Sequence, residues 1–226
     1  MILPLAKLGI EGTGSMGDDT PMPVLSKQSR SLYDYFRQQF AQVTNPPIDS
    51  LREASVMSLE TCLGVERNLF DESSLHAGRL ILESPILSNQ VFKKLLSYHK
   101  KGFPGDTLSI HYDKNIDLEE AINTICDRAV RSVKKGNVLI ILSDQGLNKD
   151  QLTIPAAMAV GAVHHRLINE GVRCDCNIIV ETASSWNSHH FAVLLGYGAS
   201  AIYPYLAFNI INDLIIRNSL NTKAYA

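Results

Sequence analysis

The sequence has 226 residues, of which 45% are hydrophobic and 19% are charged, and its formal net charge is -2. A chain of this length can bury a sizeable core. The 21 basic and 23 acidic residues nearly balance, which argues against nucleic acid or a membrane surface as a partner. Because no apolar run reaches the ~18 residues of a membrane span and no secretory signal pattern is present, we expect a soluble, intracellular protein. The four cysteines are expected to be reduced thiols rather than a disulfide framework.

The first motif along the chain is a glycine-rich stretch. Gly12-x-Gly14-x-x-Gly17 has the spacing of the dinucleotide-binding fingerprint. That fingerprint requires a buried strand before it and a helix after it, so that the phosphates meet a helix N-terminus. Here Asp18 and Asp19 place negative charge where a phosphate would bind, and two prolines follow. We therefore interpret the stretch as a rigid acidic loop and expect no nucleotide there.

Residues 1–105 are predicted to be mainly helical, with loops rich in glycine and proline. Apolar residues recur at helical spacing after Ser26, and this helix would stop before Asn45, because the residue before a proline is disfavoured in helical backbone. Ser50 and Glu53 have the spacing of a capping box, which predicts a new helix at that point. Further short helices are expected over 73–82 and 89–99.

Residues 106–210 alternate between strand and helix patterns. Strands are predicted over 107–112, 137–143, 176–181 and 199–204, with helices over 118–133, 155–170 and 188–196. Asp117 is expected to cap the first of these helices. Alternation with short connections indicates right-handed crossovers, so the fold class is α/β, with three or four βα units in a parallel sheet or incomplete barrel. Residues 211–226 are predicted to be a C-terminal helix or tail.

Polar residues follow the predicted strands at their carboxyl ends. Asp113, Asp144 and Glu181 occupy such positions, as do Ser143, Thr182 and Tyr203. Ligands gather at this edge of parallel sheets, so these carboxylates could serve acid–base chemistry in a free-standing small-molecule enzyme. The alternative is that they cap the helices that follow, and the sequence shows no nucleophile with a neighbouring base.

Neighbouring histidines and a Cys-x-Cys raise the question of a metal site. Neighbours on a helix point ~100° apart, so one histidine pair cannot readily chelate one ion. Two thiolates at i and i+2 of a strand lie ~7 Å apart, which is too far for one zinc unless a turn draws them together. We expect no metal, with a mixed Cys/His module as the alternative. The residues concerned are His164, His165, His189, His190, Cys174 and Cys176.

Several long blocks of sequence resemble one known domain. The blocks are "GSMGDDTPMPVLS", "LYDYFRQQFAQVTNPPIDSLRE", "IPAAMAVGAVHHRLI" and "HHFAVLLGYGASAIYPYLA". Together, over about residues 4 to 207, they resemble the central domain of the large subunit of glutamate synthase. Two shorter stretches, "VETA" and "GYGASA", look more like the ferredoxin-dependent class than the NADPH-dependent one.

The resemblance implies a place in a larger enzyme. Glutamate synthase makes two glutamates from glutamine, 2-oxoglutarate and a reductant, using a glutaminase domain and an FMN barrel that carries a 3Fe-4S cluster. The partners implied are those two domains, together with ferredoxin or an NADPH-dependent small subunit. The chain carries neither catalytic domain, so we expect a fragment that is inactive alone, binds no cofactor itself and works in the cytoplasm or plastid stroma.

The resemblance also implies a role in passing ammonia between the two catalytic domains. Gln42, Thr44 and Asn45 are uncharged and stand beside a rigid Pro-Pro turn, so they could line a path for neutral ammonia. Asp18 and Asp19 are expected to face a neighbouring domain. The sequence therefore predicts a connecting and tunnel-forming domain, with the small-molecule enzyme and the metal module as alternatives.

Overall fold

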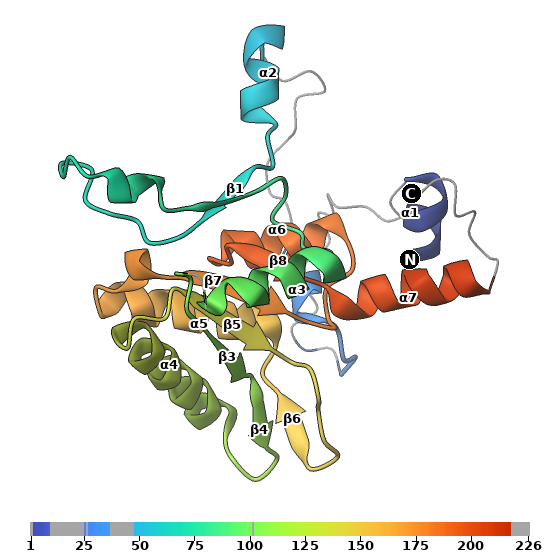
Figure 1. Cartoon of the computed structure of the whole chain (residues 1–226). Coiled ribbons are helices and arrows are strands. Elements are labelled where there is room, and N and C mark those ends of the chain that lie inside the picture. Colours follow the sequence, from blue (N-terminus) through green and yellow to red (C-terminus); the bar gives the residue numbers. More distant parts are fainter. Residues whose placement is uncertain (1, 10–24, 26, 37–47, 101, 218–226) are drawn as a thin grey trace.

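The computed structural model describes residues 2–9, 25, 27–36, 48–100 and 102–217 (Figure 1). The helices are α1 Ile2–Leu8, α2 Ser50–Val56, α3 Asn89–Ser97, α4 Leu118–Lys134, α5 Ala156–Asn169, α6 Ser188–Gly196 and α7 Tyr205–Ile216. The strands are β1 Thr61–Leu63, β2 Leu80–Leu82, β3 Gly105–Ser109, β4 His111–Asp113, β5 Leu139–Ser143, β6 Gln151–Thr153, β7 Asn177–Glu181 and β8 Ala201–Tyr203. Short 3-10 helices are η1 Leu32–Tyr35, η2 Ser74–Ala77, η3 Tyr98–Lys100 and η4 Arg173–Asp175.

A four-stranded parallel sheet forms the centre of the molecule. Its strand order is β3-β5-β7-β8, so strands that follow one another along the chain are also neighbours in space. The helices α4, α5 and α6 lie in the connections between these strands. The α/β fold class and its βα units are therefore confirmed, and the small antiparallel pairs β1–β2 and β4–β6 add to them.

The sheet is buried on both faces. Ile140 and Leu142 of β5 pack among the apolar side chains of α4, α5 and α6. Leu139 and Ile141, which alternate with them, belong to a second core that also contains Phe92 of α3. Coverage of both faces explains the continuous apolar runs of the central strands, because parallel strands with two buried faces have no polar side.

The helices of the βα units form where the sequence predicts them. The Asp117 side chain accepts a hydrogen bond from the Glu119 amide at the start of α4, as a helix cap does. The end of α5 is followed by Gly171, which adopts a positive φ of 69°. One helix, α7, runs through position 210, on both sides of the predicted division there. The division of the chain into 1–105, 106–210 and 211–226 stays a prediction.

The helix predicted after Ser26 is wrong in its described part. Only the 3-10 turn η1 forms, and Phe36 is already extended. Contacts of Tyr33 account for this: it is buried, its hydroxyl lies 3.3 Å from the Ser184 hydroxyl, and its ring stacks on His190 at 4.2 Å. These contacts fix a tight turn where helical spacing alone predicted a longer element. Residues 37–44 of that prediction lie outside the described residues.

Two predictions in the N-terminal part are corrected. α2 begins at Ser50 as expected, but its cap is Asp49, whose carboxylate accepts from the amides of Leu51 and Arg52. The carboxylate one residue earlier replaces the predicted capping box. The helix predicted over 73–82 is instead η2 followed by β2, because β2 pairs antiparallel with β1. The helix predicted over 89–99 is confirmed as α3.

The strand predicted over 107–112 divides into two. β3 ends at Ser109, whose hydroxyl accepts a hydrogen bond from the His111 amide at 3.2 Å. The chain then turns into β4, which pairs with β6 rather than with the parallel sheet.

Within the described ranges, no helix combines the length and apolar character needed to cross a membrane.

Candidate functional site

The carboxyl edge of the sheet carries a row of polar side chains. Ser109, Ser143, Glu181 and Tyr203 are the last residues of the four parallel strands and lie opposite one another in the register. Ser143, Glu181 and Tyr203 are buried, whereas Ser109 is exposed. This edge is where parallel α/β folds bind ligands, so it is the first place to look for chemistry.

Glu181 is buried beside Asp144. The Ser143 hydroxyl donates a hydrogen bond to Glu181 Oε2 at 2.6 Å. Burial raises the pKa of Glu181, and the nearby charge of Asp144 adds to this, while the Ser143 hydrogen bond acts in the opposite direction. A carboxyl group in this position favours its proton-bearing form more than an exposed glutamate does.

Asp144 fixes the loop that follows β7. Its carboxylate accepts hydrogen bonds from the Thr182 hydroxyl at 2.6 Å and from the Ala183 amide at 3.0 Å. The Thr182 hydroxyl also lies 2.9 Å from the Ser184 hydroxyl and accepts from the Ser184 amide. The carboxylate therefore holds residues 182–184 in one conformation at the end of β7.

Aromatic rings close over this loop. The rings of Tyr33 and His190 stack, and the ring of Trp186 meets His190 edge to face with a centroid distance of 4.7 Å. The His189 ring nitrogen Nε2 lies 2.9 Å from the backbone carbonyl of Tyr33. Burial lowers the pKa of His190 to about 4, with a smaller contribution from His189. His190 is therefore a neutral packing residue at neutral pH.

The structure brings together two of the three predicted strand-end carboxylates. Asp144 and Glu181 lie side by side, but Asp113 is exposed at the end of β4, outside the parallel sheet. There it accepts from the backbone and side-chain nitrogens of Asn115. The break after Ser109 is the reason, because it carries Asp113 away from the edge. The predicted ring of acidic residues is therefore a pair.

Sequence reasoning named Tyr203 at this edge but missed two further tyrosines, Tyr205 and Tyr33. Burial and then the charge of Asp144 raise the pKa of Tyr205, which begins α7. Tyr33 reaches the same edge from a part of the chain 151 residues before Ser184. Tyr205 follows the end of β8 by two residues, whereas no local pattern marks Tyr33, because it reaches the site through long-range packing.

The chemistry available at this edge is limited by its hydrogen bonds. Ser143, Asp144, Glu181 and Thr182 all have partners inside the protein, so their polar atoms serve the scaffold. Two buried atoms in the described ranges nearby, Ser185 Oγ and Trp186 Nε1, have no hydrogen-bond partner. The described residues form two hydroxyl–carboxylate pairs at this edge, Ser143 with Glu181 and Thr182 with Asp144, and all four side chains are buried.

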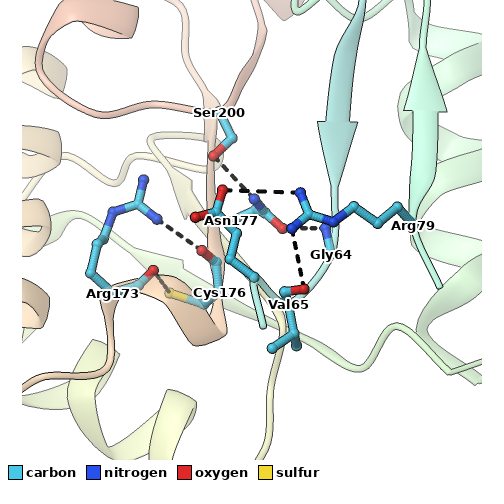
Figure 2. A network of polar contacts seen from close by, with 8 residues as sticks. Gly64, Val65, Arg79, Arg173, Cys176, Asn177 and Ser200 are labelled. Carbon is cyan, nitrogen blue, oxygen red and sulfur yellow. Dashed lines mark hydrogen bonds and ion pairs between the residues drawn. The ribbon is translucent and has the colours of Figure 1, made fainter. Parts of the chain in front are cut away.

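A second polar network lies at the opposite, amino end of β7 (Figure 2). Figure 2 shows the Asn177 side chain between the backbone of Gly64 and the hydroxyl of Ser200. The Gly64 amide donates to Asn177 Oδ1 at 2.6 Å. Arg173 donates to the carbonyls of Cys176 and Gly198. These contacts join the β1–β2 pair and the loop before β7 to the body of the molecule.

An open apolar hollow of about 420 Å³ lies beside the edge loop. Figure 1 shows α1 alongside α7, and the hollow lies between these helices and Trp186. Its lining is Ile2, Leu3, Trp186, Ile210 and Leu214. This lining offers contact area but little polar recognition.

The histidines and cysteines do not form a metal centre in the described part of the chain. His164 and His165 lie on α5, and the His164 ring accepts from Arg173 at 2.9 Å. Cys176 is buried, and burial raises its pKa to about 11, whereas Cys174 is exposed. Across the described ranges, no three His, Cys, Asp or Glu side chains are grouped to hold an ion. Asp18, Asp19, Gln42, Thr44 and Asn45 lie outside the described residues.

Comparison with known proteins identifies one family. The family model for the glutamate synthase central domain matches residues 1–226. Similar proteins include the ferredoxin-dependent glutamate synthase of Pyropia yezoensis, 45% identical over 90% of this chain and 13% of the relative. Ferredoxin-dependent glutamate synthase 2 of a Synechocystis strain is 43% identical over 94% of this chain and 14% of the relative. The NADPH glutamate synthase large chain of Bacillus subtilis is 41% identical over 92% of this chain and 14% of the relative. The chain thus spans about one seventh of the length of these curated relatives.

Proposed function

The chain belongs to the glutamate synthase central domain family, and we propose that it acts as the connecting, non-catalytic domain of a glutamate synthase. The complete enzyme would convert glutamine and 2-oxoglutarate, with a reductant, into two glutamates. By the same resemblance, its partners are a glutaminase domain and an FMN barrel. Ferredoxin is the electron donor we favour, with NADPH through a small subunit as the alternative, since relatives of both kinds match.

One observation supports the non-catalytic role most directly. The carboxylates at the sheet edge, where a catalytic site would be expected, are bound to groups of the protein itself. Asp144 then holds the loop after β7 and Glu181 bonds to the end of β5, rather than either acting on a substrate. This favours a scaffold domain over the free-standing small-molecule enzyme.

The iron–sulfur cluster of glutamate synthase does not fit the cysteines of this chain. An iron–sulfur cluster is held by cysteine thiolates brought close together. Here Cys62 lies on β1, Cys126 lies on α4, and Cys174 and Cys176 precede β7. Burial raises the pKa of Cys126 and of Cys176, which opposes thiolate formation. We place FMN and the 3Fe-4S cluster in other parts of the enzyme.

We assign the ammonia path to the segment that follows the Tyr33 turn. Gln42, Thr44 and Asn45 are neutral, and a charged lining would protonate or retain ammonia. The turn just before this segment is anchored at the sheet edge through Tyr33. In the complete enzyme, Asn45→Trp should uncouple glutamine hydrolysis from glutamate formation. The measurement is the ratio of glutamine consumed to 2-oxoglutarate consumed. An unchanged ratio would contradict the assignment of the path.

The proposed function as a whole is tested by exchanging domains. The 226-residue chain would replace the matched segment of the Synechocystis enzyme, to which it is 43% identical. We expect the purified graft to form glutamate from glutamine, 2-oxoglutarate and reduced ferredoxin, and the isolated chain to form none. A graft that is folded but unable to make glutamate, or an isolated chain that turns over either substrate, would overturn the proposal.

A further inference from the structure

An arm extends from the body of the molecule. We define the arm as residues 49–82, which comprise α2, the β1–β2 pair and the loop between those strands. Figure 1 shows α2 standing away from the sheet and the β1–β2 loop extending beyond it. None of the residues of α2 is buried. The α2 part of the arm therefore adds surface to the molecule, whereas Leu63 at its base belongs to the second core.

The outer part of the arm is strongly apolar. Leu69 and Phe70, in the β1–β2 loop, are 91% and 93% exposed, and Leu51 of α2 is 92% exposed. Further exposed apolar side chains of the arm are Val56, Met57, Leu59, Leu75 and Ile81. Single exposed apolar residues are ordinary, but Leu69 and Phe70 are adjacent in the chain and almost completely exposed, which favours an interaction at this point.

The base of the arm is fixed to the body. Leu63 is fully buried, and the Gly64 amide donates to Asn177 at the start of β7 (Figure 2). The Glu66 amide donates to the Cys174 carbonyl at 2.8 Å. These contacts hold the start of the β1–β2 loop at a set position, although the apolar side chains at its tip are exposed to solvent.

The arm is also the acidic part of the chain. It contains six acidic and three basic residues, a formal charge of -3, whereas the whole chain carries -2. Asp71 and Glu72 directly follow Phe70 at the tip. A second copy of the arm would bring like charges together, which disfavours self-pairing. A partner with apolar residues inside a rim of Lys and Arg would complement the tip.

We propose that the arm tip, residues 69–72, docks onto a neighbouring domain of the same, longer polypeptide, on an apolar surface with a basic rim. This inference rests on the proposed function. The matched segment is 13–14% of each relative, so 86–87% of the relative's length lies outside it and can supply that surface. A domain linked in the same chain meets the tip at high effective concentration, so a small apolar contact is enough.

The test uses the graft into the Synechocystis enzyme and a photoreactive residue. Benzoylphenylalanine would replace Phe70 at the tip or, as a matched control, Leu147 in the loop after β5, which is 53% exposed. After irradiation, we expect crosslinks from position 70 to residues outside the grafted chain, at least tenfold more abundant than from position 147. Asp71→Lys together with Glu72→Lys should lower the yield at least threefold.

The outcomes separate this inference from the proposed function. Crosslinks from position 70 only within the grafted chain, only between two copies, or no more frequent than from position 147 would overturn the docking surface. Glutamate formation is assayed on the same samples. An active graft without the crosslink rejects the docking surface alone, whereas an inactive graft that forms it supports the surface and rejects the proposed function.

Discussion

At the scale of single residues, buried polar groups organise the carboxyl edge of the sheet. Asp144 is only 9% exposed, yet both of its oxygens accept hydrogen bonds from the loop after β7. Thr182, its hydroxyl partner, is fully buried. Buried polar atoms that lose their partner retain the full cost of leaving water. The loss of any one of these hydrogen-bond partners should therefore destabilise the edge.

Replacing Asp144 should test this directly. Asp144→Ala leaves the Thr182 hydroxyl and the Ala183 amide without their acceptor, so the free energy of unfolding should fall by about 1–3 kcal/mol. Urea denaturation followed by circular dichroism measures the change. The matched control is Asp113→Ala, because the Asp113 carboxylate accepts from Asn115 at an exposed position, and a loss within about 0.5 kcal/mol is expected. Equal losses in the two variants would contradict the described role.

His190 should make the free energy of unfolding depend on pH. Its pKa is lowered from 6.5 to about 4, so the unfolded chain binds its proton first as the pH falls. The stabilisation is complete above pH 6.5 and should be lost as the pH falls through 4. His190→Phe, which keeps a ring against Tyr33, should remove this part of the pH dependence. Unfolding between pH 4 and 7 and titration of the His190 ring by NMR measure it; a ring that titrates near 6.5 would refute the buried, neutral assignment.

At the scale of elements, short-range hydrogen bonds decide where strands end and which sheet they join. The hydroxyl of Ser109 accepts a hydrogen bond from the amide of His111, and β4 then pairs outside the parallel sheet. The pattern of residues 107–112 is continuous, so nothing in its periodicity marks the break. At the arm base, Gly64 has a φ of 147° and a backbone that approaches Gly78 closely.

Gly64→Ala should loosen the base of the arm. An added Cβ would lie 3.1 Å from the Gly78 carbonyl, and φ at this position is unfavourable for any side chain, so a loss of about 1–3 kcal/mol is expected. Gly196→Ala is the matched control, because a Cβ there meets nothing within 4 Å. Thermal unfolding and amide exchange of β1 and β2 measure the effect. Similar behaviour of the two variants would argue against a constrained junction.

At the scale of the whole molecule, the body and the arm should differ in local stability. β5 and β7 are completely buried, whereas α2 is a seven-residue helix with no buried residue. Helices this short are marginal without packing. In the isolated chain, amides of β5 and β7 should exchange only on global unfolding, and those of α2 at least a hundredfold faster. Exchange measured by NMR checks this, and equal protection would mean that α2 is packed.

The sequence by itself determined the βα succession, the central strands and most helix starts. These features depend on neighbours a few residues apart: apolar runs such as residues 139–142, or the carboxylate of Asp117 two residues before the amide it caps. Much of the candidate edge was also predictable, since Ser143, Glu181 and Tyr203 end strands of one parallel sheet and Asp144 directly follows one of them. The blocks of sequence that resemble the central domain of glutamate synthase indicate the family without knowledge of the fold.

Only the tertiary structure decided what those residues do. Tyr33 meets Ser184 across 151 positions, Asp113 leaves the edge because the strand breaks, and the Gly64 amide anchors the base of the arm at Asn177. The physical reason is that such contacts depend on segments brought together from distant parts of the chain, which local periodicity does not encode. Local chemistry thus set the elements, and long-range packing set the geometry of the sheet edge and the direction of the arm.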